Sequence, residues 1–452
     1  MKIPEKAPKW QEVFSDPGKM EIMFKEENIE KLNNFVKKVE QKDEYAYWDK
    51  VKHFEMPEGI SPRVAWAFLK FSRGSKLDTV SLISQGKNEF QYWITDSILK
   101  NLSFVDKHTS GEILVEETNI HKAEQKKYLI SSLMEEAIAS SLLEGAATTR
   151  KEAKKMLRSG RNPKTKAEQM VFNNYQTILK IKNLTKRKLT KKLLLDLHSS
   201  MTANTLENPE ECGRFRISED DKIYVRDKEE NTLYEPPRPE QIDSMLEMLY
   251  SYANDSDEKN YTHPAIKAIN LHFYLSYIHP FMDGNGRTAR ALFYWYMMKT
   301  GYWMFEYLTI SKIFLSAPSR YARAFLYTEI DDLDLTYFIS FHLRAVRIAI
   351  ERLVEHIKSK QKEEKENAVY LRKFPELNER QKSLVKHALR NPDYIYIISE
   401  HKSIHSVTYE SARRDLTELE RSKFLIRSKK GKTFIFTPVE KLDSIIKKRK
   451  EK

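Results

Sequence analysis

The spacing of hydrophobic and polar residues along the chain predicts a mainly α-helical protein. From 121 to 145, apolar and small side chains recur at steps of three and four, the period of one helix face, and Gly145 is a natural end. The same period predicts a helix over 264–278 and a long helical region over 287–353. Residues 10–104 are expected to form helices rich in aromatic side chains, to which the sequence assigns no chemistry.

The helical period is lost between residues 213 and 237. Short β-prone runs appear there at 215–217 and 223–225, on either side of an acidic turn, and prolines follow. This pattern predicts a hairpin that forms a flap. A target peptide can add as an extra strand to the edge formed by Ile223, Tyr224 and Val225, and a purely structural hairpin explains the pattern equally well.

The last part of the chain has the pattern of a separate domain. A charged stretch at 351–372 is too polar to pack and is expected to be a solvated helix or linker. Three helical segments and two β-rich runs then predict a winged helix over 373–440, followed by a basic tail at 441–452. DNA and protein are both open as its partners, and the charges that would contact DNA phosphates are those of Arg413, Arg414, Lys429 and Lys430.

Composition bears on the number of domains, the compartment and the partners. The 452 residues exceed what one core usually fills, so two or three folded units are expected. Cys212 is the only cysteine, which excludes an intrachain disulfide and fits a reducing compartment. The longest apolar stretch, 291–298, is far shorter than the roughly 20 residues that span a bilayer, and the first ten residues lack the apolar core of a signal peptide. We therefore expect a cytoplasmic protein with no membrane association.

The charge balance favours negatively charged partners. Lysine and arginine exceed aspartate and glutamate, and the net charge of +13 suits nucleotides or nucleic acid. A solvated basic surface explains the same excess equally well. The sequence leaves the oligomeric state, a homodimer included, open.

The chemistry-bearing residues are concentrated in one loop, HPFMDGNGRTAR at 279–290, between two predicted helices. Gly284 and Gly286 allow the backbone to turn back and present N–H groups, and the helix that follows directs its positive end to the same point. Arg287 and Arg290 are three residues apart and can reach the same anion. The loop is therefore predicted to bind phosphate oxygens.

Two further side chains of this loop suit a reaction at the phosphate. Asp283 is a hard oxygen ligand of the kind that holds Mg²⁺ together with substrate phosphates. His279 can accept a proton from an incoming hydroxyl at neutral pH. Each feature is common in ordinary turns and helix ends, but their occurrence together favours a catalytic site. A metal site formed by His279 and Asp283 is less favoured, because no third protein ligand lies close in the sequence.

This loop matches the signature of the Fic family, HPFx[D/E]GNGRxxR, at every defined position. The chain resembles that family from about Ser131 to Arg344, through an upstream SxxxEG segment, the Tyr-Glu-Pro-Pro sequence at 234–237 and a later DLTYFIxF element. The resemblance implies a Fic domain over 111–350, with an all-helical core and a β-hairpin flap. An N-terminal helical region, 1–110, would precede it.

The resemblance also implies a function. Fic proteins of this type are protein adenylyltransferases, which transfer AMP from Mg-ATP to a serine, threonine or tyrosine hydroxyl of a target protein or of themselves. His279 would be the general base and Asp283 the Mg²⁺ ligand. The phosphates would be held by Gly284, Asn285, Gly286, Arg287 and Arg290.

The helix upstream of the loop resembles the family's inhibitory motif, [S/T]xxxE[G/N]. The matching residues are Ser140, Glu144 and Gly145. We expect Glu144 to pair with Arg290 in the place of the γ-phosphate and Ser140 to orient Glu144, although a plain helix end explains the motif too. Two other functions stay open: a DNA-binding regulator whose Fic domain senses nucleotide, and a Fic enzyme that removes AMP or transfers another phosphate-linked group.

Overall fold

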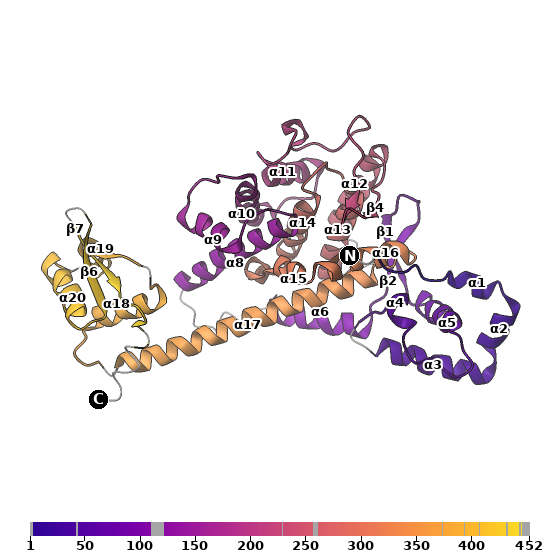
Figure 1. Ribbon diagram of the computed structural model, residues 1–452, viewed down its shortest axis with the longest axis horizontal. Helices are drawn as coiled ribbons and strands as arrows, with labels where there is room; N and C mark the ends of the chain where they lie inside the picture. Colours follow the sequence, from indigo (N-terminus) through magenta and orange to yellow (C-terminus); the bar gives the residue numbers. More distant parts are fainter. Residues whose placement is uncertain are drawn as a thin grey trace. The chain divides into compact units, whose positions relative to one another are not determined.

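The chain forms two compact units, Met1–Leu353 and Val354–Lys452 (Figure 1). The computed structural model describes residues 3–41, 44–109, 122–227, 229–255, 261–372, 374–392, 394–405, 407–430, 433–442 and 444. Most of the basic tail expected at 441–452 therefore lies outside the described residues.

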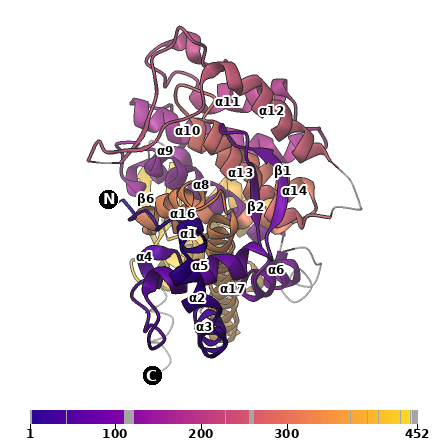
Figure 2. The ribbon, with the colours of Figure 1, turned by 90° about the vertical axis from the view of Figure 1, so that its right-hand side faces the viewer.

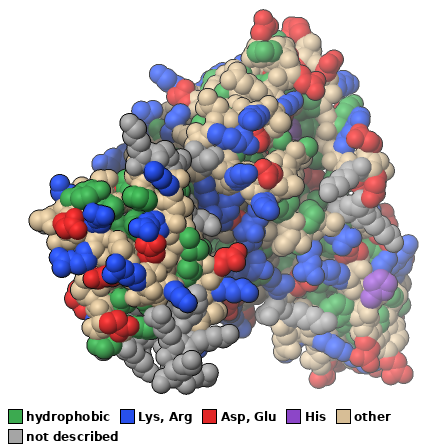
Figure 3. All heavy atoms as spheres, turned by 60° about the vertical axis from the view of Figure 1, so that its left-hand side comes forward, with side chains coloured by type: hydrophobic (Ala, Val, Ile, Leu, Met, Phe, Trp, Pro, Cys, Tyr) green, Lys and Arg blue, Asp and Glu red, His purple; other side chains and the backbone are tan. Residues whose placement is uncertain are grey.

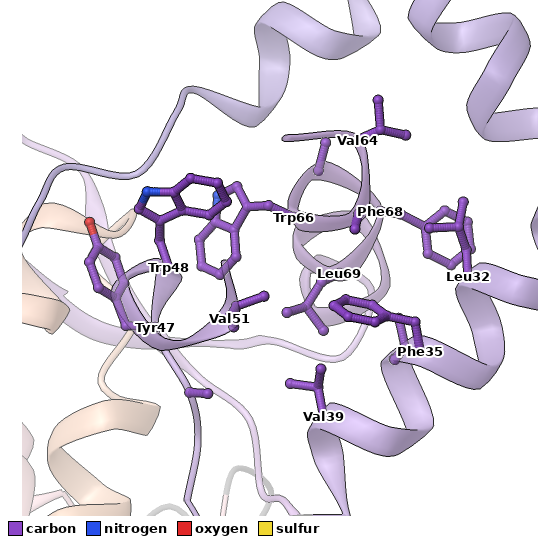
Figure 4. Packing of buried hydrophobic residues seen from close by; sticks show 14 of the residues in the cluster. Leu32, Phe35, Val39, Tyr47, Trp48, Val51, Val64, Trp66, Phe68 and Leu69 are labelled. Atoms are coloured by element: carbon purple, nitrogen blue, oxygen red, sulfur yellow. The ribbon is translucent and has the colours of Figure 1, made fainter. Parts of the chain in front are cut away.

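The N-terminal part of the first unit is built from short helices around an aromatic core. Figure 4 shows Trp48, Trp66 and Leu69 packed together, with Phe35 and Val39 reaching them from a neighbouring helix. Later tyrosines, Tyr327 and Tyr337, join the same core, so this region packs against the central helices. The helices are α1 (Trp10–Phe14), α2 (Pro17–Phe24), α3 (Glu26–Glu40), α4 (Trp48–Val51), α5 (Pro62–Gly74) and α6 (Asp96–Thr109).

The expectation that residues 10–104 are helical throughout was wrong at one place. An antiparallel hairpin of β1 (Asp78–Ile83) and β2 (Glu89–Tyr92) separates α5 from α6. In β1 the buried side chains of Val80 and Leu82 alternate with exposed ones, which is the period of a strand. The run is too short for this period to stand out from the helical text around it. The hairpin lies beside α12 (Pro239–Asn254) (Figure 2).

The central part of the first unit is a bundle in which α13 (Pro264–Ile278) and α14 (Asn285–Lys299) pack most extensively against each other. Both helices are buried on nearly every side, which is why neither shows a polar face in the sequence. The predicted helix at 264–278 is confirmed, and α14 begins two residues before the expected start. The surrounding helices are α8 (Lys122–Leu143), α9 (Arg150–Ser159), α10 (Lys166–Leu184), α11 (Lys191–Thr202), α15 (Ile310–Ser316), α16 (Pro318–Ile330) and α17 (Thr336–Arg372), with two short 3₁₀ helices, η1 (Pro209–Glu211) and η2 (Trp303–Tyr307).

The flap contains a hairpin, but its strands are not the predicted ones. The paired segments are β3 (Val225–Arg226) and β4 (Thr232–Tyr234), whereas residues 215–217 and 223–224 form no strand. The reason lies in the acidic turn. Asp220 accepts two 2.7 Å hydrogen bonds from the Arg214 guanidinium and one of 2.8 Å from the Ile217 backbone N–H, which folds the first run into a loop.

The second unit has its own hydrophobic core. It contains α18 (Glu379–Arg390), α19 (Ile398–His405), α20 (Tyr409–Arg421) and a sheet with the order β5 (Tyr396–Ile397), β7 (Thr433–Pro438), β6 (Leu425–Lys430). Asp415 ties the helices together, since it accepts hydrogen bonds from Arg380 at 2.7 Å and from Asn378 at 2.8 Å. Three helices and a hairpin are present where the sequence placed them, and the winged helix stays a prediction.

The stretch at 351–372, expected to be a solvated helix or linker, is helical. It forms the second half of α17, which runs without a break through the boundary between the two units. Among the described residues, no helix is both long and apolar enough to cross a bilayer. Lys and Arg side chains are spread over the face drawn in Figure 3, in keeping with the net charge of +13.

Candidate active site

The loop between α13 and α14 is held in shape by its own backbone. His279 ends α13 with a left-handed conformation, φ 50°, and Gly284 caps α14 with φ 82°. A Cβ at Gly284 would lie 2.6 Å from a methyl group of Thr202 and 3.4 Å from the His198 ring. This position therefore requires glycine for its conformation and for the close approach of α11.

His279 is placed to act as a base. Its side chain is half-buried, and Nδ1 lies 3.2 Å from the Ser276 carbonyl, which can only accept a hydrogen bond. Nδ1 therefore carries the proton, and Nε2 keeps its lone pair. Burial lowers the pKa of His279 to about 4, an effect that the nearby Arg216 guanidinium reinforces. The imidazole is neutral at physiological pH.

Asn285 closes the loop. Its side-chain oxygen accepts a 2.9 Å hydrogen bond from the Phe281 N–H, and its side-chain nitrogen donates one of 2.7 Å to the Phe281 carbonyl. The side chain is buried with both of its polar atoms engaged. It thus holds the turn that presents the N–H groups of α14, which is a different task from direct contact with phosphate.

Arg287 lies beneath the loop. Its guanidinium is fully buried, donates a 3.1 Å hydrogen bond to the Met201 carbonyl and lies 3.5 Å from an Asp283 carboxylate oxygen. The buried Nε–H has no partner among the described residues. Arg287 therefore keeps a donor that a ligand oxygen can satisfy.

The upstream helix meets the loop as the sequence led us to expect. Arg290 forms an ion pair with Glu144, with Nη1 and Oε1 2.9 Å apart. The Glu144 carboxylate also lies against the first turn of α14, since a Cβ on Gly286 would be 2.3 Å from Oε1. Burial lowers the pKa of Arg290, but the carboxylate of Glu144 and the hydroxyl of Tyr321 raise it by more, so the guanidinium stays charged.

Ser140 acts on the arginine of this pair. The Arg290 Nε–H donates to Ser140 Oγ at 2.9 Å, and Nη2 donates to the Ser140 carbonyl at 3.0 Å. The sequence motif predicts that Ser140 orients Glu144. The structure places its hydrogen bonds on Arg290, which is thereby fixed in the orientation that meets Glu144. Gly145, with φ 83°, ends the helical segment directly after Glu144.

Asp283 fits a magnesium ion that is shared with a substrate. Its side chain is 50% exposed, and no cluster of three metal-ligating side chains occurs in the described parts of the chain. Mg²⁺ usually takes one or two protein carboxylates and completes its shell with water and phosphate oxygens. A single exposed carboxylate beside the phosphate-binding turn has this chemistry.

Two residues that position the loop were not predicted from the sequence. The first of them is Arg216. From Nε it donates a 2.8 Å hydrogen bond to the His279 carbonyl, and from Nη2 it donates to the Ile278 carbonyl at 3.3 Å and to the Pro237 carbonyl. Its backbone N–H also donates to the Pro280 carbonyl at 2.9 Å. Arg216 thus joins both ends of the flap segment to the end of α13. The signal available in the sequence was only its place between Phe215 and Ile217, in a short β-prone run.

His198 is the second residue that the sequence did not reveal. Its Nδ1 accepts a 3.2 Å hydrogen bond from the Gly213 N–H, so Nε2 carries the proton and donates to the Asp283 carbonyl at 2.9 Å. The ring stacks on Phe281 at 3.7 Å between centroids, and burial lowers the pKa of His198 to about 4. Nothing in the sequence around His198 distinguishes it from an ordinary core histidine.

The remaining predicted site residues are those of the flap and of the second unit. Ile223 lines a groove of about 300 Å³ together with Arg216 and Glu235, whereas Tyr224 and Val225 do not line it. Arg413, Arg414 and Lys429 are exposed in the second unit, and the Lys430 side chain lies outside what the structure describes.

Comparisons with known proteins place the loop within a segment that resembles one family. Residues 188–297 match the model of the Fic/DOC family. The protein adenylyltransferase Fic of Drosophila grimshawi is 33% identical over 117 residues, which are 26% of this chain and 22% of that protein. The protein of the same name from Nematostella vectensis is 31% identical over 109 residues, 24% of this chain and 23% of that protein. The chain thus spans less than a quarter of the length of these curated relatives.

Solved structures support the fold. A Fic family protein from Desulfovibrio desulfuricans superposes with a TM-score of 0.53 at 17% identity, over 77% of this chain and 98% of that one. A variant of Fic-1 from C. elegans gives a TM-score of 0.51 at 18% identity, over 78% and 92% of the two chains. The helical unit that carries the loop therefore has a Fic-type fold, and at residues 188–297 the chain contains a Fic/DOC family domain.

Proposed function

We propose that the protein is a protein adenylyltransferase that transfers AMP from Mg-ATP to a serine, threonine or tyrosine hydroxyl of a target protein or of itself. The observation that carries this proposal is the neutral imidazole of His279, with a free Nε2, beside the N-terminus of α14. The relatives named protein adenylyltransferase Fic support the same assignment.

In this reaction His279 takes the proton of the acceptor hydroxyl on Nε2. The hydroxyl oxygen bonds to the α-phosphorus, the bond from that phosphorus to the bridging oxygen breaks, and pyrophosphate leaves. The N–H groups at the start of α14 and the guanidinium of Arg290 stabilise the negative charge on the phosphates. The protein contributes by positioning and charge neutralisation, as phosphoryl-type transfers require.

Asp283 would hold Mg²⁺, which when bound neutralises charge on the α and β phosphates. The carboxylate is kept in place by its neighbours, because Oδ1 accepts a 2.5 Å hydrogen bond from the Gly284 N–H. The Asp283 carbonyl is fixed by His198. Arg216 and Asn285 keep the backbone of the loop in the conformation that presents His279 and the α14 N–H groups together.

We also propose that Glu144 restrains the enzyme. The carboxylate lies against Gly286 and pairs with Arg290. It therefore occupies the N-terminal end of α14 and engages the guanidinium, both of which a terminal phosphate would contact. ATP can bind productively only after these contacts are exchanged. Removal of Glu144 is therefore expected to free the phosphate site.

Transfer of label from ATP tests the reaction. The full chain is incubated with Mg²⁺, a cell lysate and ATP labelled with ³²P at either the α or the γ position, and labelled proteins are separated on a gel. Label from the α position alone is expected, and it should disappear in His279→Ala. Label from the γ position would identify a kinase instead. Undiminished α labelling in His279→Ala would show that the imidazole is not the base.

The second unit supports a further, binding function. Arg413 and Arg414 are exposed on α20, on the side away from the buried Ala412 and Leu416, and Lys429 is exposed on the neighbouring hairpin. This arrangement supports contact with DNA phosphates by a winged helix. A gel shift that weakens with salt, and that the double variant Arg413→Ala, Arg414→Ala abolishes, is expected. An unchanged shift in that variant would show that Arg413 and Arg414 do not contact DNA, and no shift in the wild type would leave a protein as the partner of this unit.

A further inference from the structure

The first unit contains a basic cavity apart from the active-site loop. Its volume is about 370 Å³, and it lies among α15, α16, α17 and the segment around Tyr45. No residue of the loop 279–290 lines it, and neither does Ser140 or Glu144. Tyr321 on α16 points to the other side, where its hydroxyl lies 2.9 Å from His272. The lining residue Arg323 is two positions further along, on the opposite face of the same helix.

The charge of the cavity is strongly unbalanced. One carboxylate, that of Glu44, lines it, and this group is already paired with Lys50 at 2.5 Å. Like charges gathered around a cavity repel one another unless an anion lies between them. The lining therefore favours a negatively charged ligand. Its basic side chains are those of Lys50, Arg320, Arg323, Arg344 and Arg352.

Two polar groups of the lining lack partners. Arg323 Nε and Ser340 Oγ are buried and form no hydrogen bond with any residue that the structure describes. Leaving a buried donor without a hydrogen bond destabilises the protein, so such groups usually have a ligand or water. A guanidinium and a hydroxyl at one cavity match the oxygens of a phosphate group.

Most of the remaining lining is aromatic or apolar. The hydroxyl groups of Tyr327 and Tyr337 donate hydrogen bonds to Asp49 at 2.7 Å and to Asp331 at 2.6 Å. These two residues therefore contribute their aromatic rings to the cavity wall. Phe341 and Tyr45 add two further rings. Aromatic rings beside arginines suit a ligand that combines a planar base with a phosphate. A cavity of this size is within the range that holds small organic ligands.

We propose that this cavity is a second ligand site, distinct from the active-site loop, that binds a nucleoside phosphate. The phosphate is held by Arg323, Ser340 and the exposed Arg320, and the base lies against the rings of Tyr327 and Phe341. The site does not depend on the transfer reaction, because none of its residues belongs to the catalytic loop.

Hydrogen–deuterium exchange with AMP and GMP as probes tests this site. In the wild-type protein, at least one nucleotide is expected to protect peptides from 317–328 and 340–352. In Arg323→Ala this protection is expected to require at least about tenfold more nucleotide, because a charge-assisted hydrogen bond is lost. Protection of 279–290 should be the same in both proteins, which separates the cavity from the active site.

The controls distinguish ligand binding from folding. Arg347→Ala removes an exposed arginine of α17 that does not line the cavity and pairs with Glu351 at 2.9 Å, so it should bind nucleotide as the wild type does. The Tm of Arg323→Ala without nucleotide should equal or exceed that of the wild type, because a crowded positive charge is removed. Equal nucleotide affinity in wild type and Arg323→Ala, or no protection of 317–328 and 340–352 by either probe, would overturn the proposal. Protection by inorganic phosphate at the same concentration would show that the base is not recognised and would overturn the nucleoside assignment.

Discussion

Removal of the Glu144 carboxylate is the most direct perturbation of the proposed restraint. Glu144 and Arg290 form their ion pair at 2.9 Å, with side-chain exposures of 27% and 4%. A charged hydrogen bond of this kind contributes about 1.5–3 kcal/mol. If ATP must break the Glu144–Arg290 ion pair to bind productively, Glu144→Gly should increase the rate of α-phosphate transfer at subsaturating ATP about tenfold to hundredfold.

The assay is self-labelling by α-³²P-ATP over a range of ATP concentrations, with His279→Ala in the Glu144→Gly background as the inactive reference. Glu135→Gln is the matched control. It removes a carboxylate from α8 that pairs with Arg150 and Lys154, both at 2.6 Å, and not with Arg290. Labelling by Glu135→Gln should equal that of the wild type.

Two results would refute this reasoning. Labelling by Glu144→Gly within twofold of the wild-type rate would show that the ion pair does not limit productive binding of ATP. An equal increase in Glu135→Gln would show that loosening of α8, rather than release of Arg290, raises the rate. Thermal unfolding of each variant verifies that the labelling rates compare folded proteins.

Three further predictions concern the support of the loop. Arg216→Met should lower the transfer rate at saturating ATP at least about tenfold, because three carbonyls around His279 lose their donor; an unchanged rate would show that the loop holds its shape without Arg216. Gly284→Ala should destabilise the protein by about 1–3 kcal/mol in urea unfolding, since it combines a positive φ with a 2.6 Å approach to Thr202. Gly301→Ala, at a glycine with φ 95° and open space around it, should lower the stability less. Equal losses of stability in the two variants would show that the approach to Thr202 does not matter. The pKa of His198 is about 4 in the folded protein against 6.5 for the free side chain, so protons bind the unfolded chain more tightly. Stability should therefore fall between pH 6.5 and pH 4, by up to about 3 kcal/mol for this group, and equal urea midpoints at pH 7 and pH 5 would contradict it.

The parts of the fold that the sequence predicted are those set by local pattern. The helix at 264–278 and the turn that follows it could be located because apolar residues recur at helical spacing along it and because proline and glycine mark the ends. The contact of Glu144 with Arg290 was also foreseen, since both residues stand in motifs that resemble a known family. The flap strands were misplaced because β propensity cannot show that Arg214 and Asp220 close a loop there.

Hydrogen bonds between residues far apart in the sequence position parts of the site that local sequence pattern cannot predict. Arg216 reaches a carbonyl 63 residues away and His198 one that is 85 residues away, and neither partner is a side chain that a motif can reveal. Asn285 stands inside the signature, yet its amide is satisfied by the Phe281 backbone once the turn has formed. The identity of the reacting groups is thus encoded locally. Their positions, their buried surroundings and their shifted pKa values arise only when distant segments pack around them, because backbone carbonyls carry no residue-specific signal in the sequence.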